Sequence, residues 1–335
     1  MAEEYLLEIR HLDKFFTVKG GGPWKKPEIL RAVSDVSFCL KEGETLGIVG
    51  ESGCGKSTLG NTIIRLLDPT SGEILFQGKD LAKMKKRELA KYRPDMQMIF
   101  QDPYSSLNPR MRVFDIIAEP LRTHHVLAGE DLRKRVLELM TVVGLDVSYA
   151  SRYPHEFSGG QRQRIGIARA LALRPKLIIC DEPVSALDVS IQAQILNLLR
   201  QLQEKFHLTY IFIAHGLPSV RHISSKIAVM YLGKMVEMTS RDQLFAAPMH
   251  PYTLGLFEAI PIPDPSFRKP EEDREILQGD IPNALHPPSG CYFHPRCPYA
   301  REECRTREPV LEEKQPGHFV ACHYPISIKE SDKKA

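Results

Sequence analysis

The 335-residue sequence has no apolar run close to the roughly 20 residues that a helix needs to cross a bilayer. Its first residues, Met1-Ala2-Glu3-Glu4-Tyr5, are acidic and lack the apolar core of a signal peptide. The net charge is only +3, which gives no basic surface for nucleic acid or anionic lipid. We therefore expect a cytosolic chain without a nucleic-acid partner, which can act at a membrane only through other proteins.

Internal repeats and a long coiled-coil insertion are also missing. The length fits about two domains, and the 42% hydrophobic content is ordinary for a globular protein with a sizeable core. We place a domain boundary at residue 258, with a main domain over 1–258 and a C-terminal module over 259–335. Prolines mark a linker after this boundary: Pro261, Pro263, Pro265, Pro270, Pro282, Pro287 and Pro288. The last residues, 329–335, are polar and are expected to fray.

A glycine-rich segment gives the first positive signal. Its residues match G-x-x-x-x-G-K-[ST] in full: Gly50, Glu51, Ser52, Gly53, Cys54, Gly55, Lys56, Ser57 and Thr58. An apolar run over 45–49 predicts a strand before it, and apolar residues at helical spacing follow. In such a loop the backbone N–H groups approach phosphates, Lys56 neutralises the β and γ oxygens, and Ser57 ligates Mg²⁺. The alternative, a glycine turn with a chance lysine, does not explain this context.

A second phosphate-binding signal is the turn Ser158-Gly159-Gly160-Gln161. Small residues leave backbone N–H groups uncovered there, and the N-terminus of the helix predicted over 161–173 favours an anion. The chain thus offers two separate phosphate sites.

Polar side chains end three predicted strands. Asp181 and Glu182 follow the apolar run 177–180, and neighbouring carboxylates at a strand end point in different directions. Asp181 can hold Mg²⁺ and Glu182 can act as general base. Gln101 ends the run 96–100 and can reach both the metal and the attacking water. His215 ends the run 210–214; it is either a capped structural residue or a donor to the γ-phosphate.

The remaining pattern predicts an α/β fold. Residues 5–49 alternate as strands do, with Val36, Phe38 and Leu40 on one face, and Phe15-Phe16 offer a flat surface for adenine or for packing. Strands are also expected over 72–78 and 227–231, and a helix over 191–206. Between 111 and 157 the apolar residues have helical spacing: Ile116, Ile117, Leu121, Leu132, Val136, Leu139 and Val143. Strands and helices alternating around a phosphate loop indicate a doubly wound sheet.

Taken in order, these motifs resemble the ATP-binding subunits of ABC transporters over residues 5–258. The resemblance implies a P-loop ABC ATPase core: a mixed sheet, an antiparallel β subdomain and an inserted α-helical subdomain at about 103–157. It implies ATP and Mg²⁺ as ligands and a head-to-tail dimer. Each ATP then lies between one subunit's Walker A segment and the other's Ser158–Gln161 turn, with Ser185–Asp188 across the seam. It also makes Phe16 the adenine-stacking residue.

Two stretches narrow the resemblance to the oligopeptide/dipeptide importers: Ile99 to Arg110, and the tail from Pro288 to Pro325. Such ATPases hydrolyse ATP at the cytoplasmic face of the membrane. They pair, identical or not, with two permease subunits and, indirectly, with an external peptide-binding protein. Import of another solute, such as nickel or an oligosaccharide, and a soluble ATPase acting on DNA or ribosomes stay as alternatives. Phe157 replaces the commoner Leu, and Gly216 stands where an Asp usually follows the histidine.

Four cysteines crowd into the tail at the spacing C-x5-C-x6-C-x17-C: Cys291, Cys297, Cys304 and Cys322. In a reducing compartment a metal explains them better than disulfides do. Structural zinc sites usually contain a C-x2–4-C pair, which this tail lacks, so zinc is weakened as an alternative. The resemblance favours a [4Fe-4S] cluster on these cysteines, with His294, His318 and His323 as alternates. A structural role is expected for it.

Overall fold

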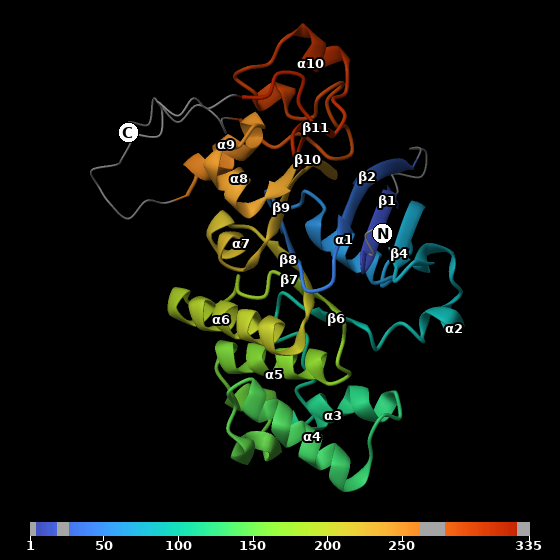
Figure 1. Cartoon of the computed structure of the whole chain (residues 1–335), viewed down its shortest axis with the longest axis vertical. Coiled ribbons are helices and arrows are strands. Elements are labelled where there is room, and N and C mark those ends of the chain that lie inside the picture. Colours follow the sequence, from blue (N-terminus) through green and yellow to red (C-terminus); the bar gives the residue numbers. More distant parts are fainter. Residues whose placement is uncertain (1–4, 19–26, 261–278, 327–335) are drawn as a thin grey trace, which may run out of the picture.

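The computed structural model describes residues 5–18, 27–260 and 279–326. The start Met1–Glu4, the prolines at 261, 263, 265 and 270, and the tail 329–335 lie outside the described residues. Two sheets organise the rest. In Figure 1 the helices α3 and α4 lie at one end of the molecule and α10 at the other, with the strands of the larger sheet between them.

The larger sheet has eight strands in the order β11-β12-β10-β9-β3-β8-β7-β6. Its parallel part consists of β6 (Met96–Ile99), β7 (Leu177–Asp181), β8 (Thr209–Ala214), β3 (Thr45–Val49) and β9 (Lys226–Tyr231). All residues of β3, β7 and β8 are buried, as expected for parallel strands covered on both faces. The apolar runs of the sequence predicted each of these strands, and the prediction is confirmed.

The antiparallel end of this sheet brings distant segments together. β10 (Lys234–Ser240) pairs with β9 on one side and with β12 (His318–Val320) on the other, and β11 (Glu312–Gln315) completes the edge. Residues 279–326, which we name the C-terminal segment, therefore extend the main sheet. The fully buried Glu237 on β10 pairs with His318 of β12 at 2.6 Å. Because β10 precedes residue 258, the sheet runs across the position at which the sequence predicts a domain boundary.

The smaller sheet is antiparallel, with the order β2-β1-β4-β5. It contains β1 (Leu7–Val18), β2 (Glu28–Leu40), β4 (Ser71–Phe76) and β5 (Lys79–Asp80). The predicted alternation is confirmed, because Val36, Phe38 and Leu40 are all buried. This sheet and α1 (Lys56–Ile63) cover one face of the larger sheet, so that Leu12, Leu59 and Ile179 share one core.

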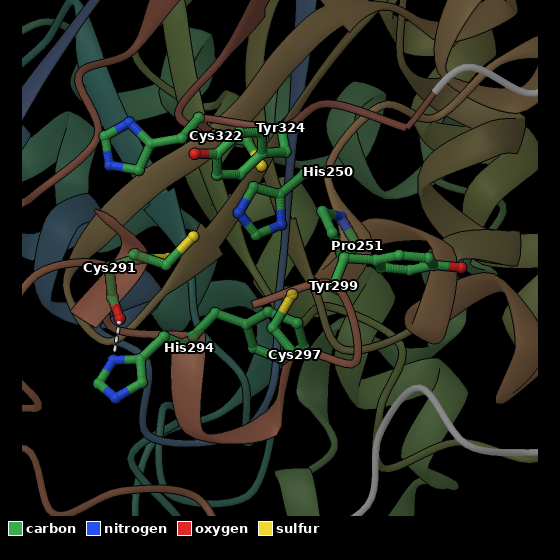
Figure 2. Close-up of a pocket in the computed structure, with 11 residues that line it drawn as sticks. His250, Pro251, Cys291, His294, Cys297, Tyr299, Cys322 and Tyr324 are labelled. Carbon is green, nitrogen blue, oxygen red and sulfur yellow. Dashed lines mark hydrogen bonds between the residues drawn. The ribbon is translucent and has the colours of Figure 1, made fainter. Parts of the chain in front are cut away.

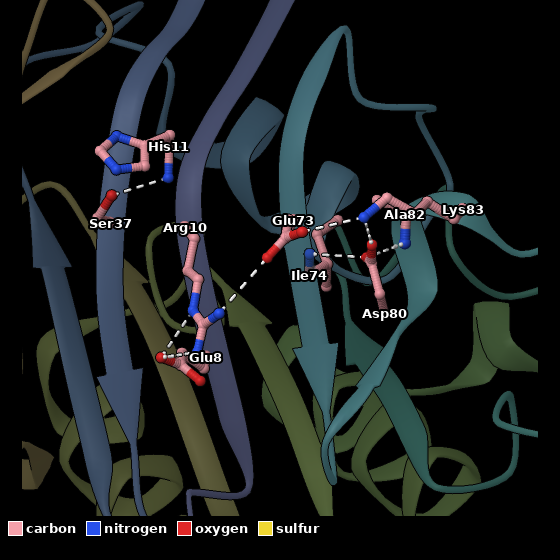
Figure 3. A network of polar contacts seen from close by, with 9 residues as sticks. All are labelled: Glu8, Arg10, His11, Ser37, Glu73, Ile74, Asp80, Ala82 and Lys83. Carbon is pink, nitrogen blue, oxygen red and sulfur yellow. Dashed lines mark hydrogen bonds and ion pairs between the residues drawn. The ribbon is translucent and has the colours of Figure 1, made fainter.

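A polar network lines the outer side of the smaller sheet (Figure 3). The Asp80 carboxylate accepts hydrogen bonds from the N–H groups of Ile74 and Ala82 and lies 2.9 Å from the Lys83 ammonium. Burial acts to raise the pKa of Asp80, but these partners outweigh it and lower the pKa below its usual value. Asp80 also caps the short 3-10 helix η1 (Leu81–Lys83), so that it fixes the turn after β5.

Helices cover the other face: α3 (Val113–Thr123), α4 (Gly129–Val142), α5 (Gly159–Leu171), α6 (Val189–Phe206) and α7 (Leu217–Ile223). Of these, α3 and α4 lie within the residues where the sequence predicts a helical region. The seven apolar residues singled out between 111 and 157 are all buried, and they pack with α5 in one core. Shorter helices complete the described chain: α2 (Lys86–Leu89), α8 (Arg241–Ala246), α9 (Pro251–Glu258) and α10 (Glu302–Thr306). The result is an α/β fold with a mixed sheet.

Candidate nucleotide site

The phosphate-binding loop joins the buried strand β3 to helix α1. Gly55 precedes the helix with a φ of +103°, and a Cβ there would come within 2.0 Å of the carbonyl oxygen of Ala32. Only glycine fits, because both the backbone conformation and the close approach exclude a side chain. The N–H groups at the start of α1 are thereby directed into the loop, where they can bind phosphate oxygens.

Lys56 is buried and folded back over this loop. Its Nζ donates to the carbonyl oxygens of Gly50 at 2.7 Å and Glu51 at 2.9 Å. One residue on, the Ser57 hydroxyl donates to Oδ1 of Asp181 at 2.8 Å. Burial raises the pKa of Asp181 and the nearby Glu182 adds to this, while Ser57, Lys56 and His215 act to lower it. A divalent cation bound between Ser57 and Asp181 would favour the charged carboxylate.

Glu182 lies between the other two predicted residues. Its Oε2 accepts from Nε2 of Gln101 at 2.6 Å, and its Oε1 lies 2.5 Å from Nε2 of His215. The Glu182 side chain is 4% exposed, while that of His215 is 43% exposed. Glu182 also has a φ of +46°, a backbone conformation that is unusual for a residue with a side chain. Parallel strand order explains the convergence, because β6, β7 and β8 are neighbours and all end at this edge.

These groups line one open cavity of about 270 Å³. Phe16 of β1 lines it beside Leu30 of β2, its partner in the smaller sheet. Most of the predicted binding residues are in this lining: Phe16, Ser52, Gly53, Gly55, Lys56, Ser57, Thr58, Gln101, Glu182 and His215. The loop residues Gly50, Glu51 and Cys54 are not part of this lining, and neither is Asp181, which accepts a hydrogen bond from the lining residue Ser57. The structure thus brings these residues together around one cavity.

The Ser158 turn is not brought to this cavity. Ser158 caps α5: its hydroxyl accepts from the N–H of Gln161 at 3.4 Å, and Gln161 Oε1 accepts from the N–H of Ser158 at 3.1 Å. Ser158 is exposed and Gly160 is buried, with a Cβ at Gly160 reaching within 2.5 Å of Ile191. The described lining of the cavity includes none of residues 158–161. The two predicted phosphate sites therefore remain separate within one chain.

Several residues at or beside the site were not predicted from the sequence. Ala284 of the C-terminal segment lines the cavity beside the β2 residues. The Tyr252 hydroxyl accepts from the N–H of Glu51 at 2.8 Å, and Arg296 pairs with the Glu51 carboxylate. None of the three carries a local motif, so only the folded chain reveals them.

The four tail cysteines line a second, small cavity together with His250, His294 and His323 (Figure 2). Burial raises the pKa of the Cys291 thiol above its usual value. For the same reason the pKa of Cys297 rises to about 11 and the pKa of Cys322 to about 12. Within the described ranges, no three His, Cys, Asp or Glu side chains form a group that could hold a metal ion. The proposed alternate ligand His318 is wrong on this geometry, because it lies on Glu237 instead of lining the cavity.

Two family models match this chain. Residues 33–185 match the ABC transporter family, and residues 236–304 match the family "Oligopeptide/dipeptide transporter, C-terminal region". The oligopeptide transport ATP-binding protein AppF of Bacillus subtilis is 53% identical over 96% of this chain and 98% of its own length. The chain is an ABC transporter ATPase of the oligopeptide/dipeptide type.

Further relatives of this ABC ATPase agree. The oligopeptide transport ATP-binding protein OppF of Salmonella typhimurium is 55% identical, with 95% of each chain covered. Among solved structures, the ATP-binding cassette MJ0796 in a dimeric post-hydrolysis state bound to ADP and phosphate has a TM-score of 0.63 and 32% identity. It covers 70% of this chain and 98% of its own. The fold and the ATPase activity of the family thus belong to this chain, with ATP and Mg²⁺ as its ligands.

Proposed function

We propose that this ABC ATPase powers the import of dipeptides or oligopeptides through a membrane transporter. The observation that carries the proposal is the position of Glu182: a buried carboxylate at the end of β7, held between Gln101 and His215 and facing the loop of Lys56 and Ser57. This arrangement suits attack of water on a γ-phosphate. The family match of residues 236–304 supports a peptide cargo over nickel or oligosaccharides.

We assign the following roles to the site residues. Glu182 would take the proton of the attacking water, while His215 would donate to the γ-phosphate and Gln101 would help to orient that water. Ser57, Asp181 and Gln101 would hold Mg²⁺, which would neutralise phosphate charge, and Phe16 would stack on adenine. One carboxylate oxygen of Glu182 accepts from Gln101, and the other lies next to Nε2 of His215.

A second subunit completes the site in this proposal. Ser158 is exposed at the start of a 13-residue helix and lies outside its own chain's cavity, so it is available to the γ-phosphate of a partner's ATP. Ser185 and Asp188 are exposed on the loop between β7 and α6, which suits the seam of a head-to-tail dimer. The dimeric MJ0796 structure supports this arrangement. The partner is a copy of this chain or a related ATPase.

In this proposal the chain is attached to the membrane through other subunits. No helix in the described ranges is long and apolar enough to cross a bilayer. We propose that the chain binds two permease subunits at the cytoplasmic face of the membrane and works with an external peptide-binding protein. The loop after β6 is a suitable contact for the permeases, since the side chains of Phe100 and Tyr104 are 39% and 65% exposed. The predicted division into residues 1–258 and 259–335, with helical residues 103–157, belongs to the same proposal.

We also propose a [4Fe-4S] cluster as the ligand of the four tail cysteines. A single zinc ion needs its ligands within about 2.3 Å of one point, and the described residues form no such group. Four thiols around one cavity fit a cluster better, because each thiolate binds a different iron. The water-accessible space is only about 10 Å³, so the thiols must move apart to admit it. When bound, the cluster would join Cys291, Cys297, Cys304 and Cys322 in a structural link.

Substitution of the proposed base tests the catalytic assignment. Glu182→Gln keeps the size and shape of the side chain but removes the proton acceptor, so we expect ATP to bind while hydrolysis falls about 10²-fold or more. Glu130→Gln, on the exposed first turn of α4, is the matched control and should hydrolyse ATP as the wild type does. Undiminished hydrolysis by Glu182→Gln would overturn the role.

A further inference from the structure

Arg296 contacts the phosphate-binding loop from a segment 245 residues away in the sequence. Its Nη1 and Nη2 donate to the two carboxylate oxygens of Glu51 at 2.8 and 2.9 Å. The side chains are only 4% and 22% exposed. A paired fork of this kind, largely removed from water, fixes both partners in direction as well as in distance.

Glu51 is also held by its backbone. Its N–H donates to the Tyr252 hydroxyl at 2.8 Å, and its carbonyl oxygen accepts from Nζ of Lys56 at 2.9 Å. Lys56 is the cation expected to contact the phosphates, and the Glu51 carbonyl holds its ammonium group. A displacement of Glu51 would therefore also displace the Lys56 ammonium group.

Arg296 is in turn held by the C-terminal segment. It belongs to the short 3-10 helix η6 (His294–Arg296), and its guanidinium lies 5.9 Å from the rings of Tyr231 and Phe293. The Tyr231, Tyr252 and Phe293 rings pack together with centroids 4.7 to 5.4 Å apart. Phe293 also lines the cysteine cavity, and Cys297 directly follows Arg296. The packing of the C-terminal segment thus determines where the Arg296 guanidinium lies.

We propose that Arg296 is a positioning residue for ATP binding, acting through Glu51, and that the C-terminal segment is thereby a working part of the nucleotide site. Its charge has a second effect. An unpaired Glu51 carboxylate in the loop would repel the phosphates, and the guanidinium offsets that repulsion. This proposal concerns nucleotide affinity and not the cargo. It can therefore be wrong while the chain imports peptides, and it can be right if the cargo is another solute.

Calorimetric titration of the full chain with a non-hydrolysable ATP analogue tests the proposal. Arg296→Met keeps the bulk of the side chain and leaves Glu51 unpaired, so we expect the Kd for ATP to rise about tenfold, which is about 1.4 kcal/mol. The KM for ATP should rise with it, while kcat at saturating ATP changes little. Arg305→Met, an exposed arginine on α10 in the same segment, is the control and should bind ATP as the wild type does.

A second substitution separates this role from a merely structural one. Adding Glu51→Gln to Arg296→Met removes the unpaired charge but does not restore the paired fork, so we expect the Kd for ATP to recover to about threefold above that of the wild type. Wild-type affinity in Arg296→Met, or a double variant as weak as the single one, would overturn the proposal. If Arg296→Met does not fold, Arg296→Lys replaces it; it loses the paired fork but keeps the charge, and a loss of about threefold is expected. Unchanged affinity in that variant also contradicts the proposal.

Discussion

The hydroxyl of Tyr252 offers a test of how α9 supports the phosphate-binding loop. Tyr252 is fully buried, and its oxygen accepts the N–H of Glu51 at 2.8 Å. Tyr252→Phe removes this single oxygen and leaves the ring contacts with Tyr231 and Phe293 in place. The change therefore isolates one hydrogen bond.

The magnitude follows from the group that is left behind. A backbone N–H that loses its partner in a buried place costs about 1–3 kcal/mol. For a domain of this size, each kcal/mol lowers the melting temperature by about 2–4 °C, so we expect a decrease of about 4–8 °C for a loss near 2 kcal/mol. The Glu51 carbonyl that holds Lys56 is on the same residue, so the Kd for ATP should also rise a few-fold.

Differential scanning calorimetry and ATP titration of the full chain measure the two effects. Tyr104→Phe is the matched control, because it removes a hydroxyl from a side chain that is 65% exposed and keeps the ring over Arg162. Equal melting temperatures for Tyr252→Phe and Tyr104→Phe would refute the view that this bond holds the loop.

Two further predictions concern the smaller sheet and the tail. Because the pKa of Asp80 is lowered in the folded chain, its contribution is present above its unfolded pKa and is lost as the pH falls through the folded value. Asp80→Ala should therefore cost about 1 kcal/mol near pH 7, as loss of a cap does, and chemical denaturation should show this deficit shrinking at acid pH; a constant deficit contradicts the assignment. Cys304→Ser should lower the iron and sulfide bound after anaerobic purification, whereas Cys39→Ser should not; equal iron in both, or none in the wild type, contradicts the cluster.

Local pattern predicted much of this molecule. The strand–loop–helix context of Lys56 and the polar residues ending β6, β7 and β8 are short-range features, and parallel strand order brings them together. The helix that follows the Ser158 turn was also predictable, because a small-residue turn before a run of helical periodicity marks a helix start.

Contacts between residues far apart in the sequence could not be predicted in the same way. The strand β12 joins β10 through two residue pairs, and a three-residue strand has too little periodicity to be recognised. The pairing of Arg296 with Glu51 depends on how the C-terminal segment folds onto the loop, and an arginine in a proline-rich stretch gives no hint of it. Ala284 reaches the cavity for the same reason, since small apolar residues carry no chemical signature.

The central claim is that hydrolysis at Glu182 drives peptide import, and transport itself tests it most directly. Vesicles containing the permeases, the peptide-binding protein and this ATPase, supplied with ATP and Mg²⁺ on the cytoplasmic side, should accumulate a labelled peptide. Vesicles with Glu182→Gln should bind ATP but accumulate none, and those with Glu130→Gln should match the wild type. Peptide uptake that persists with Glu182→Gln, or wild-type vesicles that take up nickel or an oligosaccharide and no peptide, would contradict the account.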